Sequence, residues 1–388
     1  MSSYFQMGHD TENLIGETDL DNFSGIILSP LNRTPDEFKS HIPKFREKGE
    51  FDIILDPQLY FPKSLRGKLK EHPYFPSDLD TADISSFSWW KKILKLLAEY
   101  SASINIDAIT APVIYPKIWN DEYYSICGQV TEQLNNDLLK HNINTYATVL
   151  VNLHQLSVKD EALKIASIIS NTKSTGFYII FSSDIDPRRE FSDSSELLGA
   201  MILIKSLKDT GLTVIVSQCS SDMLLYKAAG ADHCSTGKFF NLRRFTKSRW
   251  DEPSSGGGVL PYWFEHSLLA FLRETDLLRL IENEYRDMIA QEYSDNIWSR
   301  TILKKFIDEP EKPWIGLGWR QYLSWFCKAE SDLSDIKSIN TVKKWLQNAE
   351  NNWLKLEDDE ILFEEPRNNG SWIRQWRLAA IKFSKLQN

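Results

Sequence analysis

The chain has 388 residues, 42% of them hydrophobic and 26% charged, and its formal net charge is −9. This length exceeds that of most single domains and suffices for an α/β barrel with an appendage. The composition is that of a globular protein, and the negative charge argues against a general affinity for nucleic acid, because phosphate binding needs a positive surface.

Nothing in the sequence predicts export or insertion into a membrane. No apolar run approaches the roughly 18 residues that a membrane-spanning helix needs, and the polar, acidic N-terminus is unlike a signal peptide. The four cysteines are widely spaced and form no zinc-binding pattern. Reduced thiols in a cytoplasmic protein are therefore expected.

Strands and helices are predicted to alternate along most of the chain, after a polar tail at residues 1–22. Short apolar runs predict eight strands, at residues 25–30, 51–57, 104–112, 146–151, 176–181, 213–216, 231–235 and 259–262. The first helix should follow Thr34 as its N-cap, with Pro35 in the first turn. The last helix of this region is expected at residues 264–275.

This alternation predicts an α/β fold, a (β/α)8 barrel of the TIM type, over residues 23–283. An open, doubly wound sheet is the alternative. The count of eight strands favours the barrel. So does the turn after the first strand, whose sequence SPLNRTP lacks the GxGxxG pattern of dinucleotide-binding sheets.

A helical C-terminal subdomain is predicted for residues 284–388, with helices at 298–308, 317–330, 339–356 and 372–386. The spacing of its tryptophans on these helices favours packing in a core, and a surface that stacks on nucleic acid or docks a partner is the alternative. Eight of the 13 tryptophans lie here: Trp298, Trp314, Trp319, Trp325, Trp345, Trp353, Trp372 and Trp376.

The stretch at residues 213–249 suggests an anion site. It comprises a strand, a short helix ended by Gly230, a second strand, a turn of small residues and a basic run. The glycine of the turn lets the backbone approach a phosphate, which basic side chains would neutralise. A basic surface loop that pairs with the protein's own carboxylates is the alternative. The candidate anion ligands are Thr236, Gly237, Lys238, Asn241, Arg243 and Arg244.

The same order of elements, with the sequence AAGAD before the second strand, resembles the late strands of phosphate-binding (β/α)8 barrels. The resemblance covers residues 214–240 and implies a substrate that carries a phosphate group. The turn after the first of these strands, SQCSSD, departs from the glycine-rich turn usual in such barrels.

Enzymes with this fold carry their active site at the C-terminal ends of the strands. Asp56 is the first catalytic candidate, because it ends an apolar strand at a position where burial raises a carboxyl pKa towards use as an acid, base or nucleophile. A turn-capping aspartate is the alternative. Asp184 and Glu265 are further catalytic candidates. Four other strand-end residues are expected to bind substrate: Asn152, His154, Ser217 and Gln218. The wider list of strand-end residues is Ser29, Asn32, Arg33, Gln58, Tyr60, Thr110, Ser182, Asp186, Arg188, Arg189, Ser220, Asp222 and His266.

Asp56 and Asp184 together would supply the two carboxyl groups that glycosyl transfer needs. The chain shows a faint similarity to tRNA-guanine transglycosylase barrels, which implies glycosyl or base transfer with an aspartate nucleophile, although the closely spaced Cys and His of that family's zinc subsite are absent from this sequence. The sequence therefore predicts a transferase or hydrolase for a phosphate-bearing, nucleotide- or sugar-like substrate, with no metal and no cofactor.

A catalytically silent barrel is the alternative to an enzyme. Such a protein would dock a partner through its C-terminal helices, or bind nucleic acid through the basic residues of the segment 238–249.

Overall fold

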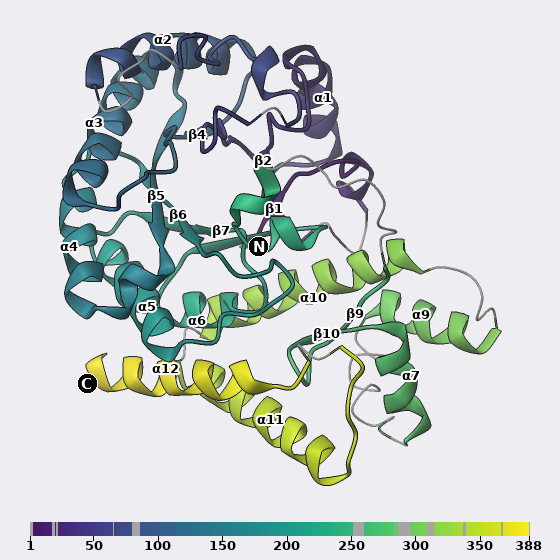
Figure 1. The fold of residues 1–388 in the computed structure, drawn as a ribbon. Coiled ribbons are helices and arrows are strands. Elements are labelled where there is room, and N and C mark those ends of the chain that lie inside the picture. The colour runs from purple at the N-terminus through teal and green to yellow at the C-terminus, as the bar shows by residue number, and fades with distance from the viewer. Residues whose placement is uncertain are drawn as a thin grey trace.

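The structure is a computed structural model that describes residues 3–17, 20, 22–64, 66–79, 86–250, 260–283, 285, 296–308, 314–336, 339–365 and 368–387. Eight parallel strands form a closed barrel in chain order, and the last pairs back onto the first (Figure 1). The chain thus has the predicted (β/α)8 barrel, with a helical C-terminal region. The strands are β1 (Ser3–Gln6), β2 (Phe23–Leu28), β3 (Asp52–Leu55), β4 (Ala108–Thr110), β5 (Asn144–Asn152), β6 (Gly176–Ser182), β7 (Thr213–Ser217) and β8 (His233–Gly237).

The first strand lies in the segment predicted to be a polar tail, and its position corrects that prediction. β1 pairs in parallel with both β2 and β8 and so closes the barrel. Its four residues are all buried, but so short a run gives no periodic signal in the sequence. The strand predicted at residues 259–262 is not in the barrel, since residues 260–262 form no strand and residue 259 lies outside the described residues.

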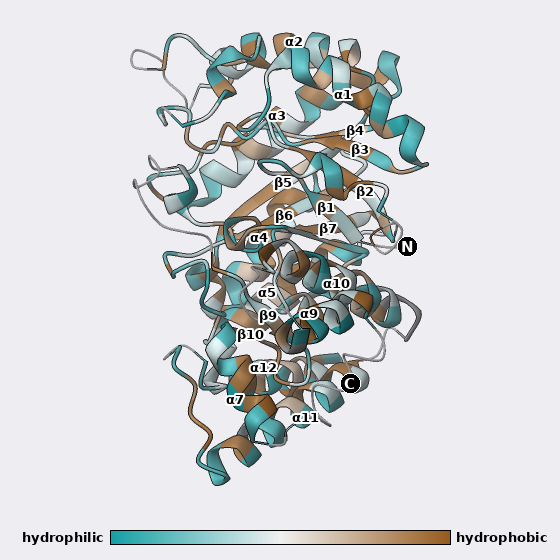
Figure 2. Ribbon diagram, turned by 90° about the vertical axis from the view of Figure 1, so that its right-hand side faces the viewer, coloured by the Kyte–Doolittle hydropathy of each residue, from teal (hydrophilic) through white to brown (hydrophobic). Residues whose placement is uncertain are grey.

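Six helices surround the barrel in the predicted order, and hydrophobic residues are concentrated along the strands that they cover (Figure 2). This pattern follows from the burial of both faces of a parallel sheet. Gly230 follows the sixth helix with a φ of 101°, in agreement with its expected role as a left-handed terminator. The helices are α1 (Pro35–Lys48), α2 (Phe87–Ser103), α3 (Asp121–Leu138), α4 (Lys159–Ser170), α5 (Ser194–Lys208) and α6 (Met223–Ala228).

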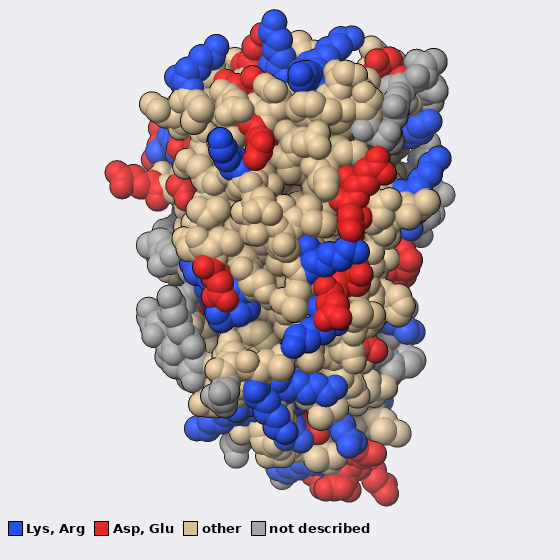
Figure 3. All heavy atoms as spheres, turned by 90° about the vertical axis from the view of Figure 1, so that its left-hand side faces the viewer, with Lys and Arg blue, Asp and Glu red and all other residues tan. Residues whose placement is uncertain are grey.

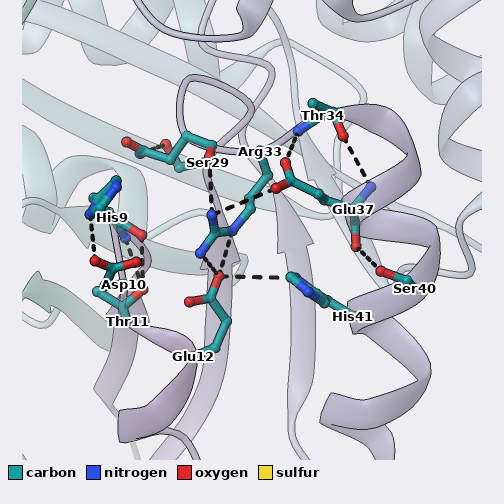
Figure 4. A network of polar contacts seen from close by, with 12 residues as sticks. His9, Asp10, Thr11, Glu12, Ser29, Arg33, Thr34, Glu37, Ser40 and His41 are labelled. Atoms are coloured by element: carbon teal, nitrogen blue, oxygen red, sulfur yellow. Dashed lines mark hydrogen bonds and ion pairs between the residues drawn. The ribbon is translucent and has the colours of Figure 1, made fainter.

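Polar contacts fix the start of α1 and the connection that leads to β2 (Figure 4). Thr34 caps the helix as predicted: its hydroxyl accepts a hydrogen bond from Glu37 N at 3.1 Å, and the Glu37 carboxylate accepts one from Thr34 N at 2.6 Å. Glu12, in a short 3₁₀ helix (Glu12–Leu14), forms an ion pair with Arg33 and lies 4.0 Å from His41 Nδ1. These contacts attach the segment after β1 to the outer layer.

The helices predicted in the C-terminal region are present: α9 (Ile297–Asp308), α10 (Ile315–Ile336), α11 (Ile339–Asp358) and α12 (Ser371–Gln387). α11 and α12 pack on each other and on α6, and α12 also packs on α5. None of the eight tryptophans predicted to pack here is exposed, and Trp376 Nε1 donates to the Phe191 carbonyl at 2.7 Å. Lys and Arg side chains gather on the lower part of the face in Figure 3. On α12, Arg374, Lys382 and Lys385 are exposed.

The helix predicted at residues 264–275 is wrong, because these residues begin with an antiparallel hairpin. Its strands are β9 (Trp263–Glu265) and β10 (Ala270–Leu272), and α7 (Glu274–Glu282) follows. The Glu265 carboxylate closes the hairpin turn by accepting hydrogen bonds from Ser267 N at 3.2 Å and Ser267 Oγ at 2.7 Å. The Glu265 side chain therefore stabilises a turn at this point, where the sequence had predicted the start of a helix.

One helix of the C-terminal region belongs physically to the barrel wall. α10 packs on β8, β1 and α6, and its buried Glu330 accepts a hydrogen bond from Cys234 N at 2.6 Å. Glu330 also accepts from Ser3 Oγ, and Lys227 Nζ lies 3.7 Å from it.

The division of the chain at residue 283 stays a prediction. Among the described residues, no helix has the length and apolar character to cross a membrane, and all four cysteines are buried and free.

The close approach of β1 to its neighbours predicts a severe effect of a single methyl group at Gly25. A Cβ there would lie 2.6 Å from the Asp52 carbonyl oxygen and would also meet the Tyr4 ring. Gly25→Ala should therefore lower the free energy of unfolding by about 1–3 kcal/mol, as overpacking does. Gly49→Ala is the matched control, since its Cβ would make only an ordinary 3.5 Å contact with Phe51. Urea denaturation measures both, and equal stability of the two variants would contradict the closure of the barrel at β1.

Candidate active site at the barrel mouth

Polar side chains gather where the barrel strands end. They come from β1, β6 and β7, from the turns after β2, β3 and β7, and from the segment after β8, and none is more than 4% exposed. Parallel strands all end at the same rim, so residues far apart in the sequence meet here. We refer to the following residues as the barrel-mouth cluster: Gln6, Ser29, Asp56, Gln58, Tyr60, Tyr178, Ser217, Gln218 and Arg249.

Asp56 is the carboxyl group of this cluster. Its Oδ1 accepts hydrogen bonds from Gln58 N at 3.0 Å and from Tyr60 OH at 2.9 Å. Its Oδ2 is buried and has no hydrogen-bond partner among the described residues. Burial raises the pKa of Asp56 to about 6, against the opposing effects of the Tyr60 and Gln58 hydrogen bonds and the positive charge of Arg249. Asp56 thus combines a near-neutral pKa with an oxygen that is available to a reacting group.

Arg249 is the cation of the cluster and reaches it from a 3₁₀ turn (Lys247–Trp250) in the segment after β8. Its Nη2 lies 3.5 Å from Ser29 Oγ, which donates to Gln58 Oε1 at 2.8 Å. Its Nη1 is buried and has no hydrogen-bond partner within the described part of the chain. Burial lowers the pKa of Arg249 to about 10, and the charge of Asp56 counteracts this shift. The guanidinium is therefore charged at neutral pH and has a donor to offer an anion or a developing oxyanion.

Uncharged groups form the other side of the cluster. Tyr178 OH lies 2.6 Å from Ser217 Oγ and 3.4 Å from Gln6 Oε1. The charges of Asp56 and Arg249 both act on the pKa of Tyr178, which burial raises well above its usual range. These groups are thus hydroxyl and amide partners beside the acid and the arginine.

Two glutamines hold strained positions at the rim. Gln58 and Gln218 have φ values of 55° and 56°, in the left-handed region that non-glycine residues seldom adopt. The Nε2 groups of Gln6, Gln58 and Gln218, together with Gln218 Oε1, have no hydrogen-bond partner among the described residues. Backbone strain and unpaired buried polar atoms cost stability, and their occurrence together at the rim makes this place the candidate functional site.

An aromatic roof covers the cluster and consists of Phe61, Tyr115, Phe245 and Trp250. The segment after β8 crosses the mouth and bridges β6 at Ser182 through Phe245. Phe61 stacks on Tyr115 with ring centroids 4.8 Å apart and lies 5.7 Å from the Trp250 ring. Below the roof, Tyr60 meets Phe245 and Trp250 edge-on. The roof separates the cluster from water, which strengthens every electrostatic interaction beneath it.

A buried ion network anchors the roof. Arg244 pairs with Glu190 at 2.6 Å and with Asp222 at 3.4 Å, and its guanidinium lies 3.9 Å from the centroid of the Phe191 ring. Burial raises the pKa of Asp222 and Glu190, and the charge of Arg244 opposes both shifts. Arg244 is therefore paired with carboxylates of the protein itself. The sequence had suggested instead that it binds an anionic group of the substrate.

The other members of the predicted anion site also have partners of their own. Lys238 Nζ lies 3.8 Å from the centroid of the Trp319 ring, and burial lowers its pKa. Arg243 donates to the carbonyls of Gly237 and Lys238, both at 2.9 Å, and lies over the Tyr322 ring. Thr236 turns outward to Tyr322 OH at 3.1 Å, and Asn241 lies in the next turn (Phe240–Leu242). This arrangement does not support convergence of these cations on one anion.

The remaining predicted residues lie outside the cluster. Asp184 exposes 76% of its side chain and lies 3.5 Å from Lys247 Nζ. His154 exposes 84% of its side chain and lies 2.9 Å from Glu196, while Asn152 Oδ1 accepts from His154 N at 3.0 Å. Glu265 is buried in the hairpin, where it also accepts from Trp263 Nε1 at 2.9 Å. No cluster of three or more His, Cys, Asp or Glu side chains that would hold a metal ion occurs among the described residues.

Three residues of the cluster were not selected from the sequence: Gln6, Tyr178 and Arg249. Gln6 lay in the presumed tail. Tyr178 lies in the middle of an apolar strand, four residues before Ser182, so that strand alternation would have placed both on the inner face. Arg249 is the last member of a basic run, and charge alone does not distinguish it from Arg243 or Arg244.

No protein-family model and no curated protein matches the chain. Among solved structures it is similar to the carboxyl transferase domain of Rhizobium etli pyruvate carboxylase (10% identity, TM-score 0.35), deoxyribose phosphate aldolase from Aeropyrum pernix (13%, 0.34) and a GH3 family glycosyl hydrolase from Mycobacterium smegmatis (10%, 0.39). The similar regions cover 56%, 61% and 60% of this chain and 34%, 84% and 83% of those chains. The chain thus spans about a third of the carboxyl transferase chain.

The ion network predicts that removal of Arg244 destabilises the protein. Arg244→Met leaves Glu190 and Asp222 buried without their counter-charge, and it should lower the free energy of unfolding by about 3–5 kcal/mol. Arg189→Met is the control, because this exposed arginine belongs to the same loop as Glu190 and its loss should change stability by no more than about 0.5 kcal/mol. Urea denaturation at neutral pH measures both. An Arg244→Met variant as stable as the wild type would show that the network does not hold the roof.

Proposed function

We propose that the protein is an enzyme that transfers a proton with Asp56 on a small, sugar-like anion bound under the roof. One observation carries the proposal: at the mouth of the barrel, Asp56 has one oxygen held by Tyr60 and Gln58 and the other without a partner. A carboxyl group with a pKa of about 6 exchanges protons readily near neutral pH.

The chemistry follows from the groups around Asp56. Ionised Asp56 takes a proton from a carbon beside a carbonyl group, and the electron pair of the broken C–H bond remains on the substrate as an enolate. The positive charge of Arg249 stabilises the enolate oxygen or holds a fixed anionic group of the substrate. The amides of Gln6, Gln58 and Gln218 are suited to substrate hydroxyls. Where the deprotonated carbon also carries a hydroxyl group, Asp56 delivers the proton to the former carbonyl carbon while the hydroxyl proton passes to the enolate oxygen. This regenerates a carbonyl group on the first carbon and completes an aldose–ketose isomerisation.

Glycosyl or base transfer, the reaction expected from the sequence, receives less support. That chemistry uses a second carboxyl group beside the first, whereas Asp184 is exposed beside Lys247 and Glu265 serves the hairpin turn. Arg249 is the cation of the cluster with an unpaired donor, and it can hold one anionic group of a substrate. Proton transfer by one carboxyl group, on a substrate with one anionic group, is therefore the better supported reaction.

Binding of nucleic acid by residues 238–249 is also less well supported. Lys238, Arg243, Arg244 and Arg249 are all buried, so that among the basic residues of this segment only Lys247 is exposed. The positive surface that nucleic acid needs is not available there.

Exchange of substrate hydrogen with solvent deuterium tests the proposal directly. The protein is incubated in D2O with fructose 6-phosphate, ribose 5-phosphate and glucuronate, and loss of the C–H signal next to the carbonyl group is followed by proton NMR. Exchange by the wild type should exceed that by Asp56→Asn about 100-fold or more. Because Asp56 must be ionised to accept a proton, the rate should fall about tenfold per pH unit below its pKa of about 6.

Asp184→Asn is the matched control, because it removes a carboxylate from the same rim but outside the cluster, and it should exchange at the wild-type rate. Exchange at the wild-type rate in Asp56→Asn would contradict the role of Asp56. Exchange of none of the three compounds above the buffer rate would contradict the substrate class.

The raised pKa of Asp56 also has a consequence for stability. The folded state binds a proton more tightly than the unfolded state, where the pKa has its ordinary value of 3.8, so ionisation of Asp56 disfavours folding above about pH 6 and has no effect below about pH 4. Asp56→Asn should therefore raise the free energy of unfolding at pH 7.5 by about 2–3 kcal/mol, at 1.36 kcal/mol per pKa unit, and the gain should vanish near pH 4. Urea denaturation at the two pH values measures it. A variant less stable than the wild type at pH 7.5 would assign Asp56 a structural role.

A further inference from the structure

A second candidate site lies beside the barrel mouth, where the loop between β6 and α5 meets the β9–β10 hairpin and the start of α12. A cavity of about 460 Å³ opens here. Its volume is within the range of roughly 300–1,000 Å³ typical of small-molecule sites. None of the residues of the barrel-mouth cluster lines it. The cavity is therefore a separate place for a ligand.

Aromatic side chains from four parts of the chain line the cavity: Phe240, Tyr262, Phe271 and Trp372. The Phe240 ring meets those of Tyr262 and Phe271 edge-on, each with centroids 5.0 Å apart. Trp372 is buried and packs edge-on against Trp353. The rings are thus held by their neighbours before any ligand binds, and such a wall favours a planar ring.

The charges on the wall leave one positive group without a counter-ion. Three of the four charged side chains that line the cavity are paired: Arg188 with Asp186 at 3.3 Å, Glu190 with Arg244 at 2.6 Å, and Glu365 with Arg273 at 2.8 Å. The fourth, Arg189, is exposed and forms no ion pair within the described part of the chain. A free guanidinium at the edge of an aromatic cavity favours an anionic group on the ligand.

Two asparagine amides supply hydrogen-bonding groups at the same wall. Asn368 Nδ2 donates to the Phe271 carbonyl at 2.7 Å, and Asn369 Oδ1 accepts from Ser371 N at 3.1 Å. These bonds orient both side chains. Asn368 Oδ1 and Asn369 Nδ2 make no hydrogen bond to the described residues, and an amide acceptor and donor of this kind match the edge of a nucleobase.

We propose that this cavity binds a nucleoside monophosphate, with its base between the aromatic rings and its phosphate on Arg189. A planar heterocycle satisfies the aromatic wall and the amides, and a terminal anion satisfies the arginine. This site does not depend on the function proposed for Asp56.

Calorimetric titration of the full chain with adenosine 5′-monophosphate, in low salt, tests the proposal. The wild type should bind it saturably, and adenosine should bind about tenfold more weakly or worse, because it lacks the group that pairs with Arg189. Arg189→Ala should weaken binding of the nucleotide about tenfold or more. Arg374→Ala is the matched control: this arginine is also exposed, lies on α12 and does not line the cavity, so its loss should leave the affinity unchanged.

Asp56→Asn separates this site from the barrel mouth and should bind the nucleotide as the wild type does. Absence of saturable binding to the wild type would overturn the proposal. Equal affinities for the nucleotide and adenosine, or for Arg189→Ala and the wild type, would do the same. Loss of binding in Asp56→Asn would place the nucleotide in the barrel mouth instead. Failure of the deuterium-exchange experiment would leave nucleotide binding by this cavity unaffected.

Discussion

The parallel pairing of β1 with both β2 and β8 is the constraint on which the rest of the structure depends. A barrel has no open edge only when its last strand finds the first, and here the first strand is four residues long. Its pairing carries Gln6 to the mouth beside Tyr178, and it places Ser3 against Glu330 of α10. The position of Gln6 in the barrel-mouth cluster and the contact of α10 with the barrel therefore both depend on the pairing of β1.

The buried charged side chains of this protein fall into two groups: those that are paired within the fold and those of the candidate site. Glu330 is held by Cys234 N and Ser3 Oγ, and Arg244 is paired with two carboxylates. These ion pairs and hydrogen bonds fix the positions of α10 and the roof, although Arg244 Nε has no hydrogen-bond partner among the described residues. In the barrel-mouth cluster, Asp56 and Arg249 form no ion pair within the described chain, and each has a polar atom without a partner. Evolution tolerates the cost of such groups where a ligand or a reaction uses them.

The sequence was most informative where a signal is local. Asp56 could be selected because it follows an apolar strand and precedes Pro57, and Thr34 because Glu37 completes its capping box. The long C-terminal helices could be placed by their periodicity. β1 was missed because four residues show no period, and the hairpin because two three-residue strands, separated by a turn that Glu265 holds, fit a short helix equally well.

The basic run at residues 238–249 was misleading for a different reason. A sequence shows the charges of Lys238, Arg243 and Arg244 but not the side chains that contact them. These are Trp319 for Lys238, Tyr322 for Arg243, and Glu190 and Asp222 for Arg244. Only the fold shows that these cations bind the protein itself, whereas Arg249 keeps a donor unpaired.

The ion pair between Arg244 and Glu190 also connects the two candidate sites. Glu190 lines the cavity beside α12. Its carboxylate also forms an ion pair with Arg244 and accepts a hydrogen bond from Ser220 Oγ beneath the roof. The C-terminal region reaches the same loop through Trp376, which donates to the Phe191 carbonyl. The position of the roof over Asp56 is therefore set partly by residues more than a hundred positions beyond the barrel strands, and the helical region is a structural component of the mouth.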